Sequence, residues 1–345
     1  AMKKDLVGIP VTAMDLPPID DLVLTDPPLS PTILGIFRGP PLGQPCDEGE
    51  KVCRSVSLFR KNLARVTLDD AELEEQVKVT LATDGVIGAN GGPRSPGTAY
   101  ILMHHCMGGV NGHRGLWGFV RGGMGGVSNA IADSARAKGA VIRTNAPVAK
   151  ILVKDGRAAG VVLESGEEIR AATIASCLDP KRTFLKLVDE KEMPPDFVEG
   201  IRKFKVEGTS LKMNLALRGR PSFRALPGDG PQHGATMHIC PSVDYVERAW
   251  DDAKYGRPSR NPLIEMTMPT MYDPTLAPEG HHIMGIFLQY APYTLRGTTW
   301  EDEREPYSRR VVEVIEEYCP GFTDLIVERQ TLSPWDLEQR FGIAG

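Results

Sequence analysis

The chain has 345 residues, of which 41% are hydrophobic and 25% charged, and its formal net charge is −5. This length predicts about two domains, and the composition is that of an ordinary soluble globular protein. The mildly acidic balance, without a Lys/Arg run, argues against nucleic acid as a partner. The sequence shows no membrane-spanning run and no signal peptide, so we expect a cytoplasmic protein, with peripheral membrane contact left open.

Residues 1 to about 60 are crowded with prolines, which predicts loops and short helices. The segment 57–80 has a helical pattern, with Asp70 suited to a helix start. A Gly/Pro-rich loop over 90–98 then leads into an apolar segment over 99–109.

A helix is predicted over 127–139, because apolar and small side chains recur on one face: Val127, Ala130, Ile131, Ser134 and Ala135. Gly139 is a natural stop for this helix. The segment 140–144 is expected to be a short strand.

Asp155-Gly156 lies between two alternating apolar runs, which is a strong signal for a β-hairpin. A second turn at 165–167 extends the hairpin into a β-meander. The segment 172–176, "ATIAS", is expected to be a buried strand that follows it.

The second half of the chain predicts an antiparallel sheet with helices on one face. Four strands are expected within residues 210–218, 235–240, 262–269 and 281–291, and two helices within 242–256 and about 303–318.

The glycine-rich stretch "GFVRGGMGG" resembles a dinucleotide loop, but Gly123-x-Gly125-x-x-Ser128 departs from G-x-G-x-x-G/A at its last position. No carboxylate for a ribose lies about 20 residues further on. Arg143 would suit a 2′-phosphate and leaves NADP open. The favoured interpretation is a connection whose glycines let the backbone pass close to another layer or a ligand.

Three other patterns suggest catalytic or metal sites only weakly. Ser128, Asp273 and His281 follow the chain order of an α/β-hydrolase triad, but glycines interrupt the strand that a nucleophile elbow needs, so Ser128 is favoured as a helix cap. The adjacent pairs His104–His105 and His281–His282, taken as strand neighbours, would point to opposite faces. We therefore expect no metal site.

Six scattered cysteines without a C-x-x-C pair indicate reduced, mostly buried thiols. Cys46 and Cys53 leave a metal or disulfide pair as the less favoured alternative. Tyr290 and Tyr293 could line an apolar cavity, or be ordinary core or rim aromatics.

Three segments together resemble the phytoene-desaturase-like branch of FAD-dependent oxidoreductases, which includes pyridine nucleotide-disulfide oxidoreductase domain-containing proteins and is a cousin of the amine oxidases. The segments are 81–176, 178–188 and 273–295, the last beginning "DPTLAPEG". The resemblance covers about residues 76–345.

The resemblance implies a fold of class α/β plus α+β. A partial FAD/NAD(P)-binding, glutathione-reductase-like domain with a β-meander would join an antiparallel-sheet substrate domain that has helices on one face. It places the first part of the substrate domain at 1–115, the middle segment of the FAD-binding domain at 116–183, and the second part of the substrate domain at 184–345.

The resemblance also implies site residues, although it identifies no catalytic residue. Cofactor contacts are expected at Val148, Ser176 and Gly123. A substrate cavity is expected to include His105, Gly125, Tyr290 and Tyr293.

The family opens with a G-x-G-x-x-G fingerprint and closes with a glycine-rich segment after "FGIAG", and neither is found in this sequence. We therefore expect an incomplete FAD-dependent dehydrogenase or desaturase that acts on an apolar small molecule, with FAD bound only in part. The alternative is a non-catalytic binding or assembly module without flavin. Exposed apolar surface around Val141–Val148 predicts that a homo-oligomer or a rearranged helix covers this face. A partner chain that supplies the missing FAD segments is the other possibility.

Overall fold

The computed structural model describes residues 22–24, 70–107, 109–110, 113–114 and 118–344. The chain divides into two compact units: unit 1 holds residues 1–131 and 208–340, and unit 2 holds 132–207 and 341–345. The domain boundaries that the sequence suggested, at 115/116 and 183/184, stay predictions.

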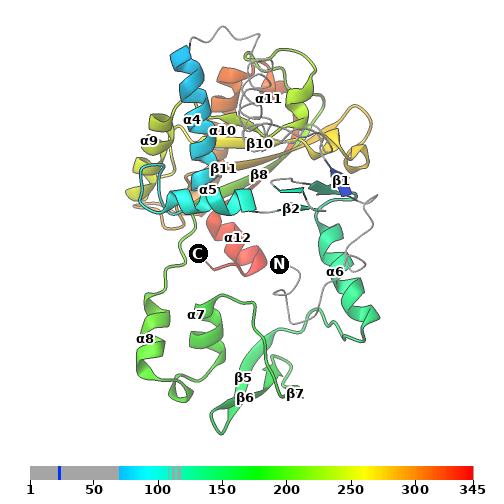
Figure 1. The fold of residues 1–345 in the computed structure, drawn as a ribbon, viewed down its shortest axis with the longest axis vertical. Helices are drawn as coiled ribbons and strands as arrows, with labels where there is room; N and C mark the ends of the chain where they lie inside the picture. Colours follow the sequence, from blue (N-terminus) through cyan, green and yellow to red (C-terminus); the bar gives the residue numbers. More distant parts are fainter. Residues whose placement is uncertain (1–21, 25–69, 108, 111–112, 115–117, 345) are drawn as a thin grey trace, which may run out of the picture. The chain divides into compact units, whose positions relative to one another are not determined.

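Unit 1 is built on a five-stranded antiparallel sheet with the order β12-β8-β11-β10-β9 (Figure 1). The strands are β8 (Ser210–Leu217), β9 (Met237–Ile239), β10 (Leu263–Thr267), β11 (His282–Gln289) and β12 (Ile326–Leu332). The four predicted strands are confirmed. The fifth, β12, was not predicted, because charged residues interrupt its apolar alternation.

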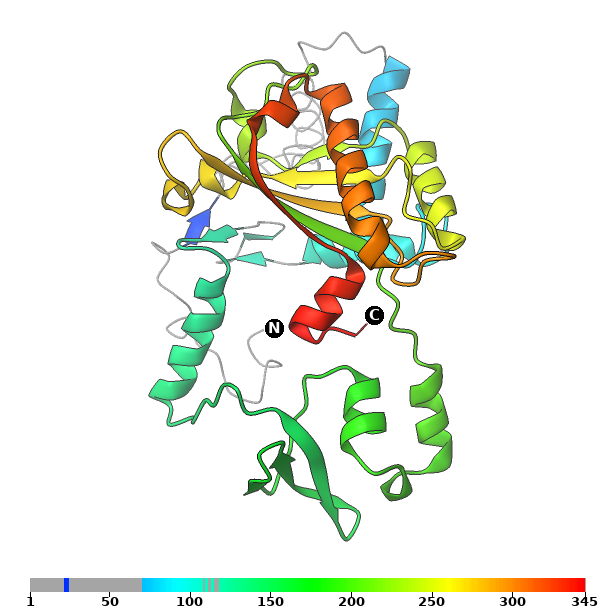
Figure 2. The same cartoon turned by 180° about the vertical axis from the view of Figure 1, so that it is seen from behind.

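One face of this sheet forms the main core. Along β8 the side chains alternate, and Leu211, Met213, Leu215 and Leu217 are all buried on the same face, as period-two geometry requires. They pack against helix α10 (Trp300–Tyr318), which lies across this face (Figure 2). The helix predicted at 303–318 is thereby confirmed.

A second core cluster joins α4 (Asp70–Val86) and α9 (Val243–Lys254) to the β10 side of the sheet. Val79 and Val86 of α4 pack with Leu263 and Tyr290. Both helices were predicted, although the part of the first prediction over 57–69 lies outside the described residues. The other described elements of unit 1 are β1 (Leu22–Leu24), α5 (Thr98–Met107), β2 (Gly109–Val110), β3 (His113–Arg114), β4 (Gly118–Val120), η5 (Pro231–Gly234), η6 (Pro269–Met271), η7 (Pro274–Leu276), α11 (Phe322–Leu325) and α12 (Pro334–Phe341).

Unit 2 contains the β-meander that the sequence predicted, formed by β5 (Val148–Lys154), β6 (Arg157–Leu163) and β7 (Glu168–Arg170). The hairpin turn between β5 and β6 has positive φ at both central residues, 51° at Asp155 and 72° at Gly156, as a two-residue type I′ turn requires. The meander is followed by α7 (Pro180–Arg182), η3 (Thr183–Leu187), η4 (Glu190–Glu192) and α8 (Pro195–Lys203).

Two predicted strands are wrong. Residues 140–144 and 172–176 are extended or irregular and exposed for the most part, with Val141 86% exposed. A strand is stabilised by pairing, and the described parts of the chain offer these segments no partner strand. The preceding helix α6 (Gly125–Ala137) is confirmed, and Gly139 follows its end with φ of 86°.

His104 and His105 correct a further assumption. They lie in the helix α5, not on a strand, so the argument that strand neighbours diverge does not apply to them. The described residues nevertheless hold no group of three or more His, Cys, Asp or Glu side chains placed to bind a metal. The Cys46–Cys53 pair lies outside the described residues, where Cys240 and Cys319 are buried and Cys177 is exposed.

Candidate functional site

The glycine-rich turn between β4 and α6 is fixed by a carboxylate from a distant part of the chain. The backbone N–H of Gly122 donates to Oδ2 of Asp273 at 2.6 Å, across 151 residues of sequence. Asp273 is 3% exposed, and its Oδ1 accepts from the N–H and hydroxyl of Thr275 at 3.1 and 2.5 Å. These hydrogen bonds hold the pKa of Asp273 below its usual value.

This arrangement decides against a diphosphate loop at the turn. Phosphate sites use free backbone N–H groups at a helix start, but here one such group already binds a carboxylate. The negative charge of Asp273 would also repel a phosphate. The turn therefore matches the favoured interpretation of the sequence, a glycine-rich connection held against another layer.

The hydrogen bonds of the residues concerned do not support the NADP site or the hydrolase triad that the sequence left as alternatives. Arg143 forms two 2.8 Å hydrogen bonds with Glu167, so its guanidinium is already engaged. Asp273 binds Gly122 and Thr275 rather than His281, whose Nδ1 contacts its own loop at Glu279 O. Ser128 lies within α6 and is not its cap.

The predicted cofactor residues fall in different units. Gly123 is in the turn of unit 1, with φ of 95°. Val148 begins β5 in unit 2. Ser176, also in unit 2, has its hydroxyl 2.8 Å from that of Thr183. Their role toward FAD stays a prediction.

The predicted cavity residues occupy four different environments. Tyr290 is fully buried and donates to Gly91 O at 2.9 Å, so it is a core aromatic. Tyr293 donates to Glu338, and this hydrogen bond raises its pKa to about 12. The ring Nδ1 of His105 lies 3.0 Å from Asp84 O. Gly125 is exposed at the start of α6.

The face of the unit 1 sheet opposite the main core carries ionisable groups in a single row. Strand register places five residues directly opposite one another across the five strands: His238, Glu265, Phe287, Lys212 and Leu332. We call this set the sheet-face row. Directly opposite residues in a sheet have Cβ atoms about 5 Å apart, so the row gathers acid, base and aromatic groups in one place.

Lys212 occupies a largely buried position in the sheet-face row. Burial lowers its pKa, and Glu265 opposes this only in part. Its ammonium lies over Gly285, where an added Cβ would be 2.9 Å from Nζ and 3.4 Å from the hydroxyl of Thr267. Because Gly285 has no side chain, the long lysine side chain can extend across the neighbouring strand.

Two carboxylates flank the other end of the row. Glu265 lies 3.1 Å from Nε2 of His238, and both side chains are mostly buried. Asp84, on α4, has its pKa raised to about 6, chiefly because burial disfavours its charged form, while His238 and His105 oppose the shift. Shifted groups from several elements that gather in one place are typical of functional sites.

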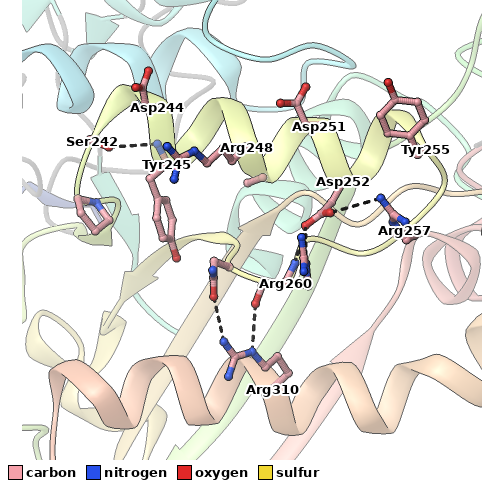
Figure 3. Close-up of a pocket in the computed structure, with 13 residues that line it drawn as sticks. Ser242, Asp244, Tyr245, Arg248, Asp251, Asp252, Tyr255, Arg257, Arg260 and Arg310 are labelled. Carbon is pink, nitrogen blue, oxygen red and sulfur yellow. Dashed lines mark hydrogen bonds and ion pairs between the residues drawn. The ribbon is translucent and has the colours of Figure 1, made fainter.

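A pocket of about 900 Å³ lies on another side of unit 1, between α9, the loop 255–262 and α10 (Figure 3). It contains none of the predicted site residues. It is lined by Pro241, Ser242, Asp244, Tyr245, Arg248, Ala249, Asp251, Asp252, Tyr255, Arg257, Arg260, Asn261 and Arg310.

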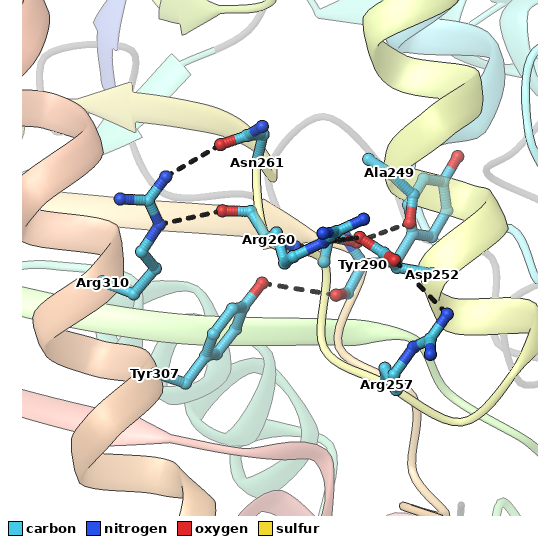
Figure 4. A network of polar contacts seen from close by, with 9 residues as sticks. Ala249, Asp252, Arg257, Arg260, Asn261, Tyr290, Tyr307 and Arg310 are labelled. Carbon is cyan, nitrogen blue, oxygen red and sulfur yellow. Dashed lines mark hydrogen bonds and ion pairs between the residues drawn. The ribbon is translucent and has the colours of Figure 1, made fainter.

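The polar contacts at this pocket fix the loop (Figure 4). Asp252 accepts from the backbone N–H of Arg260 at 3.1 Å. Arg310 donates to Arg260 O at 3.0 Å and to Asn261 Oδ1 at 2.9 Å. These side chains bind the backbone and the Asn261 side chain of the loop, so we place the candidate functional site at the sheet-face row.

A family model matches most of the chain. The model of the family described as flavin containing amine oxidoreductase matches residues 57–318. The chain belongs to this flavin-containing amine oxidoreductase family. The family's redox cofactor is therefore the one expected for this protein.

Relatives of known name support the family's oxidoreductase character. The chain is 44% identical to the pyridine nucleotide-disulfide oxidoreductase domain-containing protein 2 of Rattus norvegicus, over 81% of this chain and 49% of the relative. It is 29% identical to prolycopene isomerase 2 of an Oncidium hybrid, over 68% and 36%. It is 26% identical to a neurosporene-forming phytoene desaturase of Cereibacter sphaeroides, over 64% and 41%. The chain thus spans half or less of the length of these relatives.

A solved oxidoreductase from Methanosarcina mazei has a similar fold, with a TM-score of 0.50 and 15% identity, over 84% of this chain and 61% of that one. A second family model, described as zincin-like metallopeptidase, matches residues 6–84. That stretch contains no histidine, so it lacks the H-E-x-x-H pair that holds zinc in such enzymes.

The glycine turn does not fit the diphosphate of FAD. An anchor for the diphosphate needs unpaired N–H groups at a helix start, and the glycine turn of this flavin-family chain gives one of its N–H groups to Asp273. The sheet-face row holds ionisable groups that are largely shielded from water. We therefore assign no reaction step to the cofactor.

Sequence reasoning missed the sheet-face row. In the sequence, Lys212 is a charged residue at one of the strand positions that alternate with the apolar ones. Residues at such positions usually face solvent, so Lys212 gave no signal of a site. Among the helices that the structure describes, none is both long and apolar enough to cross a membrane.

Proposed function

We propose that this chain supplies the reactant-facing wall of an FAD-dependent oxidoreductase that removes hydrogen from an apolar small molecule. One observation carries the proposal: Lys212 is a desolvated lysine on the face of an antiparallel sheet opposite the main core, in a chain of a flavin family. A lysine with a lowered pKa has a larger neutral fraction, and a neutral amine can accept a proton.

Removal of hydrogen from two adjacent saturated carbons releases one hydrogen as a proton and the other, with two electrons, as a hydride equivalent, for which FAD would be the acceptor when bound. In the proposal, Nζ of Lys212 accepts that proton. Glu265, on the other side of Phe287 in the sheet-face row, favours the charged form of the lysine. Phe287 offers an apolar ring to the reactant between the two charged groups. The names of two relatives, a phytoene desaturase and a prolycopene isomerase, support an apolar reactant for this chain.

The alternative is a non-catalytic module of the same fold that binds no flavin. The hydrogen bond between Asp273 and the glycine turn favours this alternative. Because the carboxylate already binds the turn, the turn offers no anchor for the diphosphate of FAD. The two candidates differ in whether a flavin ring reaches the sheet-face row.

Titration of the purified chain with FAD and with riboflavin, followed by flavin fluorescence, separates them. The proposal predicts saturable quenching by both flavins, because the ring rather than the diphosphate makes the contacts. Lys212→Met should weaken the quenching about tenfold, the effect of one charge-assisted hydrogen bond. Lys154→Met, in the meander of unit 2, is the matched control and should leave it unchanged. No quenching in the parent chain would favour the non-catalytic module.

A further inference from the structure

The pocket between α9, the loop 255–262 and α10 gathers positive charge (Figure 3). Its volume of about 900 Å³ lies within the range of small-molecule sites. Four arginines line it and come from all three elements: Arg248 from α9, Arg257 and Arg260 from the loop, and Arg310 from α10. Because the formal net charge of the whole chain is −5, this concentration of guanidinium groups is a local feature of the pocket.

Two of the three carboxylates that line the pocket are engaged by cations outside it. Asp244 forms an ion pair with Arg94, and Asp251 lies 2.7 Å from the ammonium of Lys254. Neither of these cations lines the pocket. Since each carboxylate is already balanced by a cation from elsewhere, neither one balances a pocket arginine.

Asp252 is the remaining carboxylate, and two arginines share it. Its oxygens lie 3.8 Å from the guanidinium of Arg257 and 3.6 Å from that of Arg260. The side chain of Asp252 is 13% exposed, whereas those of Arg257 and Arg260 are 64% and 86% exposed, so the guanidinium groups rather than the carboxylate face the solvent. Arg248 makes no ion pair with any residue that the structure describes. One negative charge thus faces three positive charges.

Arg310 has a structural role in the pocket. It donates to Arg260 O and to Asn261 Oδ1 (Figure 4), and so it holds the loop. Glu313 and Glu317, on the same helix, lie 3.5 and 4.0 Å from its Nη1 and offset its charge. With Arg310 and its glutamates set aside, three arginines against one aspartate leave two positive charges of the pocket without a counterpart.

A phosphate group is the ligand that fits this surplus. A phosphate monoester carries a charge of about −1.5 to −2 at pH 7, which matches two unbalanced guanidinium groups. The planar guanidinium also donates two parallel hydrogen bonds to phosphate oxygens. Because Arg257 and Arg260 both lie within 4 Å of one carboxylate, they are close enough together to bind one phosphate.

The size of the pocket indicates a ligand larger than phosphate itself. A phosphate group fills only a small part of about 900 Å³. The wall on the α9 side includes Tyr245, whose hydroxyl already donates to Pro262 O at 3.0 Å. The ring of Tyr245 is therefore the part that it offers to a ligand, and it suits an organic group.

We propose that this pocket binds a small organic phosphate. Arg257 and Arg260 hold the phosphate, Arg248 adds to the positive potential, and the ring of Tyr245 faces the organic part. The loop that carries the two binding arginines is already fixed by hydrogen bonds in the free protein, which lowers the entropic cost of binding. The residues of the sheet-face row do not line this pocket, so the inference does not rest on the proposed function.

Isothermal titration calorimetry of the full chain tests the proposal with two probes. AMP and glucose 6-phosphate carry the same phosphate monoester on a planar and on a saturated body. At least one of them should bind saturably, with a dissociation constant below about 1 mM, and more tightly than inorganic phosphate. Adenosine, which lacks the phosphate, should not bind. Higher ionic strength should weaken binding, because the arginines are largely exposed.

Substitutions of the arginines locate the binding in this pocket. Arg257→Met and Arg260→Met should each weaken it about tenfold, the effect of one charge-assisted hydrogen bond. Arg248→Met should cause a smaller loss, since it removes only a nearby charge. Arg309→Met is the matched control, because Arg309 is an exposed arginine of α10 that does not line the pocket, and it should leave binding unchanged.

Three results would overturn the proposal: no binding of either organic phosphate, unchanged binding in folded Arg257→Met and Arg260→Met, or inorganic phosphate binding as tightly as both probes. Riboflavin carries no phosphate, so its quenching should be the same in Arg260→Met as in the parent chain. A failure of this inference is therefore distinguishable from a failure of the proposed function.

Discussion

The ammonium of Lys212 lies across the neighbouring strand, over Gly285, where an added Cβ would come within 2.9 Å of Nζ. The two residues are diagonal neighbours, two positions out of direct register, since Gly285 pairs with Asn214 and Lys212 with Phe287. The missing side chain at Gly285 therefore leaves the space that the lysine ammonium occupies. This contact links the identity of a glycine to the position of an ionisable group.

Gly285→Ala is predicted to move Lys212 with little effect on folding. The clashing atom is the end of a flexible side chain, so the free energy of unfolding should fall by less than about 1 kcal/mol. The protonation midpoint of Lys212 should change, as measured by NMR of the 13C-methylated lysine. In a Lys212→Met background the alanine should have no additional effect on flavin quenching. A large loss of stability in Gly285→Ala would show that the substitution displaces the backbone rather than the lysine side chain.

Lys212→Met is predicted to stabilise the protein at neutral pH by about 1 kcal/mol, because replacement of a buried charge by an apolar side chain is often stabilising. The folded-state pKa of Lys212 is lowered from its ordinary 10.5, so the penalty for its charge is present at neutral pH and fades as the pH rises toward 10.5. Chemical denaturation at pH 7 and pH 10 should show the gain shrinking. Destabilisation at pH 7 would mean that a partner compensates the charge.

Asp84→Asn is predicted to raise stability above pH 6 and to flatten its pH dependence. The folded-state pKa of Asp84 is raised from 3.8 to about 6, so the parent chain should lose stability as the pH rises through this window and stay level above it. The expected loss is about 2 kcal/mol, allowing for solvent screening. Urea denaturation at pH 4, 5 and 7 measures it. Equal pH profiles for parent and variant would contradict the burial of this carboxyl.

The meander of unit 2 is predicted to depend on its turn. Gly156→Ala places a Cβ at φ of 72° and should destabilise the unit by about 1 kcal/mol. Asp155→Gly keeps the left-handed conformation accessible and is the matched control, with a smaller effect expected. Hydrogen exchange of β5 and β6 reports on this unit separately from unit 1, and equal effects of both substitutions would argue against the type I′ turn.

Exposed apolar residues before β5 motivate a proposal about assembly. Val141 is 86% exposed and Ile142 41%, and exposed apolar side chains that form a contiguous patch mark sites of protein–protein contact. Light scattering should show a homo-oligomer, and Val141→Asp should shift it toward monomer, whereas Arg157→Asp, in the same unit, should not. A monodisperse monomer in the parent chain would contradict the proposal.

Local signals predicted much of the fold because they depend on few residues. Asp155-Gly156 specified its hairpin, and the alternation of 210–217 specified β8 with its buried face. Strand β12 was missed because Glu328 and Arg329 interrupt the apolar pattern, and it forms by pairing along β8. The segments 140–144 and 172–176 had the composition of strands but no partner.

The candidate site was harder to predict because its properties arise from tertiary register. Lys212 becomes notable only when β11 places Gly285 beside it, and Asp84 only when α4 is buried against other elements. Asp273 was considered for a hydrolase triad, and its bond to Gly122 spans 151 residues. The sequence identified the family through its motifs, but not the side chains of the sheet-face row.

The most direct test of a reactant wall at the sheet-face row is the NMR pH titration of 13C-methylated Lys212, with and without riboflavin, with Lys212→Arg used to assign the resonance. The account predicts a midpoint below the ordinary 10.5 in the free protein, and a further change when riboflavin is added. A midpoint at the ordinary value that riboflavin leaves unmoved would contradict it.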